Sequence, residues 1–180
     1  SYRGRLKEAT QMGVEYLNDD SAAADAEIIA MIVQVMQKAG LKEFQISIGQ
    51  VEYFKSLVEE ARLSEDAVIE LRQMISIKNH FGAEELLEKM HLRKDLQNAL
   101  GNLSQMFGGP EVLGIAKALT RNPKALAAVK RLEDIYRILQ LYGLEQYVVF
   151  DFGMLSKFRY YTGIIFQAYT YGNGEALVTG

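Results

Sequence analysis

The sequence lacks cysteine and tryptophan, and only two of its 180 residues are histidines and two are prolines. Without cysteine, neither a disulfide framework nor a thiolate metal site can form. The two imidazoles, His80 and His91, lie in polar stretches with helical character, so we predict no metal site and no cofactor. No run approaches the roughly 20 apolar residues of a membrane span, and no signal-peptide pattern opens the chain. We therefore expect a soluble, cytoplasmic protein without membrane contact.

The chain is mildly acidic, with a formal net charge of -3 and a pI near 5.5. A broad nucleic-acid-binding face would normally be basic, so the charge argues against such a partner. Hydrophobic residues make up 49% of the chain, which is enough for a sizeable core. The length predicts a single domain, residues 1–180.

Helical periodicity with capping signals marks several segments. Asp20 or Ser21 can begin a helix that runs to residue 39, and Asn122-Pro123 opens another strong helix. Between them, residues of about 51–121 predict a helical insert made of short helices. Within that insert, Ser64 is expected to cap one helix and Phe81-Gly82 to break it.

Alternating apolar and polar residues predict strands over four segments, at 5–16, 43–49, 147–152 and 157–169. Helices alternate with these strands, yet the strands at 147–152 and 157–169 are expected to join through a hairpin. The combination is typical of an α+β domain, with a mostly antiparallel sheet and flanking helices.

The stretch 157–169 carries the first candidate site, because one face of the predicted strand mixes hydroxyls, an amide and a glycine. That face is expected to hold Tyr161, Gly163, Ile165, Gln167 and Tyr169. Polar groups beside a glycine let a small ligand lie close to the backbone. The competing interpretation is a buried tyrosine pair in an ordinary core strand, since aromatic residues are common in strands.

The predicted strand at 5–16 carries the second candidate site. Gln11 and Glu15 fall on one face with Gly13 between them, which places an amide and a carboxylate beside room for a ligand. The competing interpretation is a solvated polar face on an edge strand.

Both stretches resemble histidyl-tRNA synthetases. Tyr160-Tyr161-Thr162-Gly163 with Phe166 and Gln167 is similar to the histidine-recognition motif of that family, and residues 4–15 are similar to the family run that contributes a Gln and an acidic residue. The resemblance implies that Gln11, Glu15, Tyr160 and Tyr161 bind L-histidine. However, Ser156 stands where the synthetase has its catalytic arginine. This departure resembles the synthetase paralogues that serve as regulatory subunits of ATP phosphoribosyltransferase.

The resemblance implies a class II synthetase-like fold, of which this chain is expected to cover only part, and a homodimer. It also implies a subunit with no catalytic residue that senses histidine and associates with a catalytic ATP phosphoribosyltransferase subunit. The first alternative is a catalytic fragment of a true histidyl-tRNA synthetase. The second is an interaction domain with a coincidental tyrosine pair. The Asp151-Phe152-Gly153 run matches a kinase tripeptide, but no Gly-rich loop, strand lysine or His-Arg-Asp run accompanies it, so we interpret it as chance.

Overall fold

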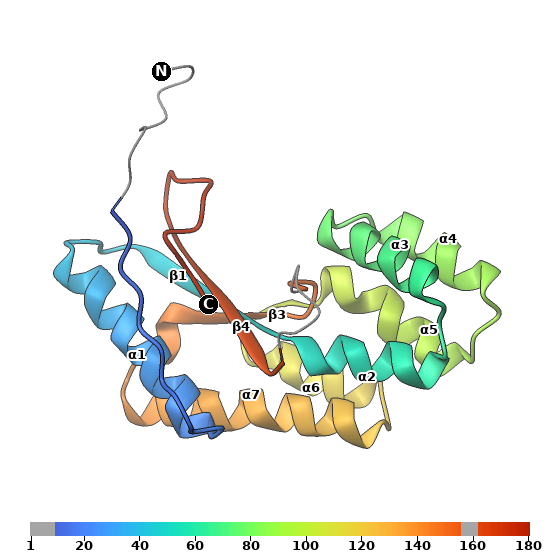
Figure 1. Ribbon diagram of the computed structural model, residues 1–180, viewed down its shortest axis with the longest axis horizontal. Helices are drawn as coiled ribbons and strands as arrows, with labels where there is room; N and C mark the ends of the chain where they lie inside the picture. The colour runs from blue at the N-terminus through green and yellow to red at the C-terminus, as the bar shows by residue number, and fades with distance from the viewer. Residues whose placement is uncertain (1–9, 156–161) are drawn as a thin grey trace, which may run out of the picture.

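The computed structural model describes residues 10–155 and 162–180. In this part of the chain a sheet lies beside a layer of helices, and a group of shorter helices extends to one side of it (Figure 1). The elements in chain order are α1 (Ala22–Lys38), β1 (Phe44–Gln50), α2 (Val51–Ala61), α3 (Glu65–Ser76), α4 (His80–Lys89), α5 (Lys94–Gly101), η2 (Asn102–Gln105), β2 (Phe107–Gly108), α6 (Glu111–Ala118), α7 (Pro123–Leu141), η3 (Glu145–Tyr147), β3 (Val148–Asp151), β4 (Ile164–Thr170) and β5 (Val178–Thr179).

The described residues form a five-stranded sheet in the order β2-β3-β1-β4-β5. The pairs β1–β4, β4–β5 and β2–β3 are antiparallel, whereas β1 and β3 run parallel. The sheet is therefore mixed, which corrects the predicted mostly antiparallel arrangement. The predicted hairpin between the strands at 147–152 and 157–169 is also wrong, because β1 lies between β3 and β4 and pairs with both.

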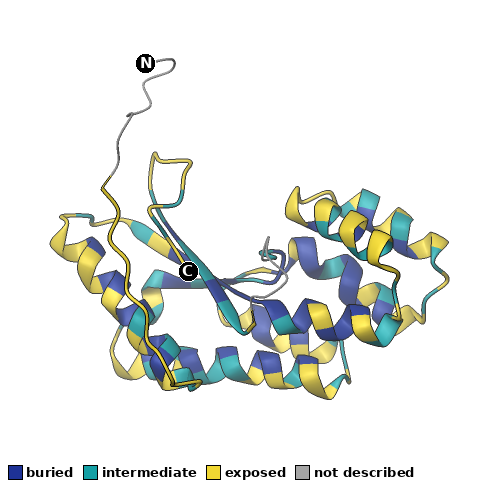
Figure 2. Ribbon diagram, viewed as in Figure 1, coloured by how far each residue is buried: buried dark blue, intermediate teal, exposed yellow. Residues whose placement is uncertain are grey.

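One face of the sheet forms the core with the helical layer. Ile46, Ile48, Phe150 and Ala168 are each 0% exposed on this face, in one cluster with buried residues of α1 and α7. The ring of Tyr136 in α7 meets Phe150 edge-on at 5.8 Å between centroids. Figure 2 shows the buried residues concentrated in the strands and along the helix sides that face them.

The two long helices begin where the capping signals predict. The Ser21 hydroxyl accepts a hydrogen bond from the Ala24 amide at 3.1 Å, and α1 follows. The Asn122 side chain accepts from the amides of Lys124 and Ala125, and Pro123 is the first residue of α7. Each cap supplies an oxygen to amides that have no partner inside the first turn of the helix.

The predicted insert contains α2 to α6, and Ser64 caps α3 as expected. The predicted break at Phe81-Gly82 is wrong, since both residues lie inside α4. The chain instead turns at 77–79, where Lys78 adopts a left-handed backbone with φ 56°. The insert also contributes β2, which pairs with β3 at the edge of the sheet.

Two predicted strands differ in the structure: the one at 5–16 is absent from its described part, and the one at 157–169 begins later. Residues 10–16 form no strand: they run as an exposed coil (Figure 1), without the neighbouring strand that a hydrogen-bonded ladder requires. The strand predicted at 157–169 begins at Ile164. Gly163 precedes it with φ 81°, a backbone conformation that a strand residue does not adopt, and residues 156–161 lie outside the described residues.

Candidate functional site

The face of the sheet opposite the helical layer is polar, and we call it the polar face. Cross-strand partners point to the same side, so the register places Gln45 with Tyr169, Ser47 with Gln167, and Gly49 with Ile165. The members of the polar face are Gln45, Ser47 and Gly49 of β1, Ile165, Gln167 and Tyr169 of β4, and Val149 and Asp151 of β3. Its amide and hydroxyl groups can recognise a small polar ligand.

The polar groups of β4 are oriented by each other. The Tyr169 hydroxyl donates to Oε1 of Gln167 at 2.6 Å, and both side chains are half-buried. Because this bond fixes the amide, Nε2 of Gln167 points away from Tyr169 and can donate to a ligand. Ser47, which is 8% exposed, lies opposite Gln167 on β1. The sequence prediction that Gln167 and Tyr169 share a face is confirmed.

A backbone turn at residues 151–154 closes one end of the polar face. A Cβ added at Gly49 would stand 2.9 Å from the Met154 carbonyl oxygen, 3.2 Å from that of Asp151 and 3.2 Å from Cγ1 of Ile165. The first of these contacts is shorter than real Cβ atoms show and the other two are tight, so glycine at this position lets the turn lie directly on β1. The Val51 amide donates to the Gly163 carbonyl at 3.0 Å on the other side of the same strand end.

The turn is held by the Asp151 carboxylate. Lys78 Nζ donates to Oδ1 at 2.9 Å and to Oδ2 at 3.0 Å, and the Gly153 amide donates to Oδ1 at 2.8 Å. Lys78 comes from the connection between α3 and α4, so this ion pair joins the helical insert to the end of β3. The sequence analysis noted Asp151 only as part of a chance tripeptide and did not single out Lys78, because the two residues lie 73 positions apart and no local pattern links them.

The four predicted histidine-binding residues are not brought together by the described structure. Gln11 and Glu15 are exposed on the coil before α1. Tyr160 and Tyr161 lie outside the described residues. The predicted site therefore stays a prediction.

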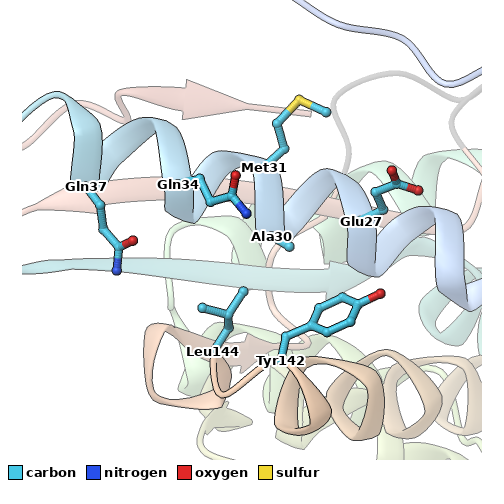
Figure 3. A pocket seen from close by; sticks show the side chains of 7 residues that line it. All are labelled: Glu27, Ala30, Met31, Gln34, Gln37, Tyr142 and Leu144. Carbon is cyan, nitrogen blue, oxygen red and sulfur yellow. The ribbon is translucent and has the colours of Figure 1, made fainter.

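A separate groove lies on the helical side of the sheet. It has a volume of about 670 Å³ and is lined by Glu27, Ala30, Met31, Gln34, Gln37, Tyr142 and Leu144. Figure 3 shows Ala30 and Gln37 pointing from α1 toward Tyr142 and Leu144, beyond the end of α7. None of the predicted site residues lines it.

The described residues offer neither a metal site nor a membrane span. No group of three or more His, Asp or Glu side chains among residues 10–155 and 162–180 could hold a metal ion. None of the helices that the structure describes is long and apolar enough to cross a bilayer.

The fold, a sheet with helices on one face and polar groups on the other, is of the class II synthetase type. The chain belongs to the histidyl-tRNA synthetase family, whose profile, described as "Histidyl-tRNA synthetase", matches residues 1–180.

The curated relatives carry a more specific name. Over 177 residues the chain is 39% identical to the ATP phosphoribosyltransferase regulatory subunit of Thermoanaerobacter pseudethanolicus, a match that covers 98% of this chain and 47% of that protein. The protein of the same name from Ruminiclostridium cellulolyticum is 41% identical over 177 residues, covering 98% of this chain and 42% of the relative. The chain thus spans about half the length of the curated relatives it matches.

Solved structures agree in fold. An ATP phosphoribosyltransferase regulatory subunit/histidyl-tRNA synthetase from Bacillus halodurans superposes with a TM-score of 0.81 at 31% identity, covering 89% of this chain and 42% of that one. A chain of the ATP phosphoribosyl transferase complex from Thermotoga maritima gives a TM-score of 0.69 at 18% identity, covering 89% and 56%. The second likeness is evidence of the fold alone.

Proposed function

We propose that this chain is part of a non-catalytic regulatory subunit of ATP phosphoribosyltransferase, which supports the first step of histidine biosynthesis. The observation that carries the proposal is the 39% identity, over 98% of the chain, with a protein of that name. Ser156, which stands in place of the synthetase family's catalytic arginine, supports a non-catalytic role. Adenylation develops negative charge on a phosphate and needs fixed cations, and a serine supplies none.

The ligand of the proposal is L-histidine, held by Gln11, Glu15, Tyr160 and Tyr161. The Glu15 carboxylate would attract the ligand's ammonium group, and the amide and hydroxyls would fix its orientation. The polar face supports this reading, because Gln167 and Ser47 add an amide and a hydroxyl next to the turn that leads into the tyrosine motif. Histidine binding would bias the whole assembly toward an inhibited state, through a coupling free energy of typically about 1–3 kcal/mol.

The partner of the proposal is a catalytic ATP phosphoribosyltransferase subunit, in a cytoplasmic hetero-oligomer that contains a homodimer of the regulatory chain. The similarly folded Thermotoga maritima chain was solved within an ATP phosphoribosyl transferase complex, which supports an assembly of this kind. Co-purification of the full-length protein from its own cell extract tests the partner. Recovery of the catalytic subunit supports the proposal, and recovery of the regulatory chain alone contradicts it.

Calorimetric titration of the full-length protein with L-histidine tests the ligand. We expect saturable heat and thermal stabilisation with histidine, and neither with an amino acid whose side chain lacks hydrogen-bonding groups, such as leucine. A titration without heat and without thermal stabilisation would contradict histidine as the ligand. The proposed partner would still be tested separately, by co-purification.

The second candidate is a catalytic fragment of a histidyl-tRNA synthetase, which the family match favours. In this case Lys157 or Arg159 would have to replace the missing arginine, although they lie one and three positions from it in the sequence. Histidine-dependent exchange of pyrophosphate into ATP distinguishes the two functions. Robust exchange would establish the synthetase, and its absence in a protein that binds histidine supports the regulatory subunit.

A further inference from the structure

The ion pair between Lys78 and Asp151 joins the helical insert to the end of β3, two parts of the molecule that lie 73 positions apart in the sequence. The Asp151 side chain is 14% exposed and that of Lys78 is 47% exposed. A cation this exposed is screened by solvent and contributes little to folding. The pair nevertheless has good geometry, because the lysine nitrogen contacts both carboxylate oxygens.

The backbone presents Lys78 in a fixed position. Its φ of 56° is left-handed, a region that a lysine adopts at some cost. The Lys78 amide donates to the Ile75 carbonyl at 3.0 Å, and the Asn79 amide donates to the Met74 carbonyl at 2.9 Å. Asn79 then caps α4 by accepting from the Gly82 amide. These bonds leave the connection between α3 and α4 little freedom, so the lysine projects from a rigid support.

On the other side, Asp151 belongs to the turn that lies on the polar face. Gly153 leaves room for the ion pair between Lys78 and Asp151, because a Cβ on residue 153 would stand 2.8 Å from Lys78 Nζ and 3.0 Å from the Leu103 carbonyl oxygen. The Phe152 amide donates to the Met106 carbonyl at 3.0 Å, and its ring packs edge-on against Tyr53 at 4.8 Å. The turn is thus held by the insert through both Lys78 and the segment that follows η2.

We infer that Lys78 is a positioning residue for the ligand site: by holding Asp151 it fixes the turn 151–154 against Gly49 and ties the helical insert to amino-acid binding on the polar face. The turn lies against Gly49, which is two residues along β1 from Ser47, the residue opposite Gln167 on the polar face. A movement of the insert therefore changes the binding site, and an occupied site restrains the insert. The inference rests on the proposed function for its ligand.

The test compares variants of the full-length protein by histidine titration, melting temperature and hydrogen exchange of the Gly153 amide. Lys78→Met removes the charge and keeps most of the side chain. Lys78→Gly removes the charge and suits the left-handed backbone, so it folds even if the methionine variant does not. Lys78→Arg restores the cation. Lys117→Met is the matched control, because Lys117 is 48% exposed and pairs with Glu133 at 3.0 Å away from the polar face.

We expect Lys78→Met and Lys78→Gly to weaken histidine binding about tenfold and to speed exchange at Gly153, while the melting temperature changes by no more than about 2 °C. Lys78→Arg and Lys117→Met should bind within about twofold of the unmodified protein. Unchanged histidine affinity in Lys78→Met and Lys78→Gly would overturn the inference. It would also be overturned if, across all four variants, the loss of histidine affinity simply paralleled the fall in melting temperature.

If neither the unmodified protein nor any variant binds histidine, the proposed ligand is contradicted, but the positioning role of the ion pair is not. The exchange measurement then decides alone. Faster exchange of the Gly153 amide in Lys78→Met supports a turn positioned by the insert, and unchanged protection overturns it.

Discussion

The Met154 carbonyl oxygen lies 2.9 Å from the position that a Cβ on Gly49 would occupy. The carbonyl belongs to the turn on the polar face and Gly49 to the central strand, so neither backbone can rotate away as a side chain would. Gly49→Ala is therefore expected to destabilise the protein by about 1–3 kcal/mol, as overpacking usually does. Urea unfolding measures the change, and we expect weaker histidine binding as well because the turn is displaced.

Gly114→Ala is the control for this prediction. Gly114 lies in α6 with nothing within 4 Å of an added Cβ, and its φ is not positive. Alanine in a helix interior is favoured by about 0.5–1 kcal/mol over glycine, so this variant should be slightly more stable. Equal stability of the two alanine variants would contradict the close approach at Gly49.

Tyr53 links α2 to α6 through a hydrogen bond inside the core. It is 0% exposed, and its hydroxyl donates to the Ala116 carbonyl at 2.8 Å. Tyr53→Phe leaves that buried carbonyl without this partner, so we expect a loss of about 1–2 kcal/mol in unfolding free energy. Tyr142→Phe, at a residue that is 56% exposed, should change it by less than about 0.5 kcal/mol.

Tyr53 also predicts a dependence on alkaline pH. Burial raises the pKa of its hydroxyl above the ordinary value of 10.0. The unfolded chain releases this proton near pH 10 while the folded chain keeps it, so the contribution is complete below pH 10 and is lost as the pH rises. The stability difference between the unmodified protein and Tyr53→Phe should shrink by about 1 kcal/mol between pH 10 and 11, because the unfolded tyrosine is already half ionised at pH 10. A difference that stays constant in urea titrations at the two pH values would contradict the assignment.

Asn122 caps α7 and also ties it to α2. Its Oδ1 accepts from two helix amides, while Nδ2 donates to the Ser56 carbonyl at 3.2 Å and to Glu60 at 2.7 Å. Asn122→Ala should lower the free energy of unfolding by about 1–2 kcal/mol, at the upper end for a cap, because both the oxygen and the nitrogen of the side-chain amide form hydrogen bonds. Ser64→Ala removes a cap with a single bond of 3.3 Å and should cost less. The reverse order in thermal or urea unfolding would refute this explanation.

The sequence predicts those elements whose signals are local. Ser21 and Asn122 are capping residues next to the helices that they begin, so both helices could be placed within a residue or two. The order of strands is not local. The pattern at 147–152 and 157–169 predicts two strands, but only the folded chain shows that β1 separates them. Likewise, alternation at 10–16 is a property of the segment, whereas a strand also needs a neighbour with which to pair.

The candidate site likewise has features that local sequence signals predict and features that depend on contacts between distant residues. Gln167 and Tyr169 are two residues apart on one strand, so their shared face follows from the period of a strand. The contact between Lys78 and Asp151 depends on a left-handed residue between two helices and on the path of a turn, neither of which has a sequence signal here. Gln11, Glu15, Tyr160 and Tyr161 were chosen by resemblance, and their meeting in one pocket stays a prediction.

Tyr169 provides the final prediction, which concerns the ligand. Its hydroxyl fixes the Gln167 amide at 2.6 Å, so Tyr169→Phe frees that amide to rotate and removes one polar group from the polar face. We expect histidine affinity to fall about three- to tenfold, the effect of one neutral hydrogen bond, with little change in melting temperature. Tyr171→Phe is the control two residues further on, where the side chain is 91% exposed beyond the end of β4. Equal affinities of the two phenylalanine variants in calorimetric titration would place the ligand away from Gln167.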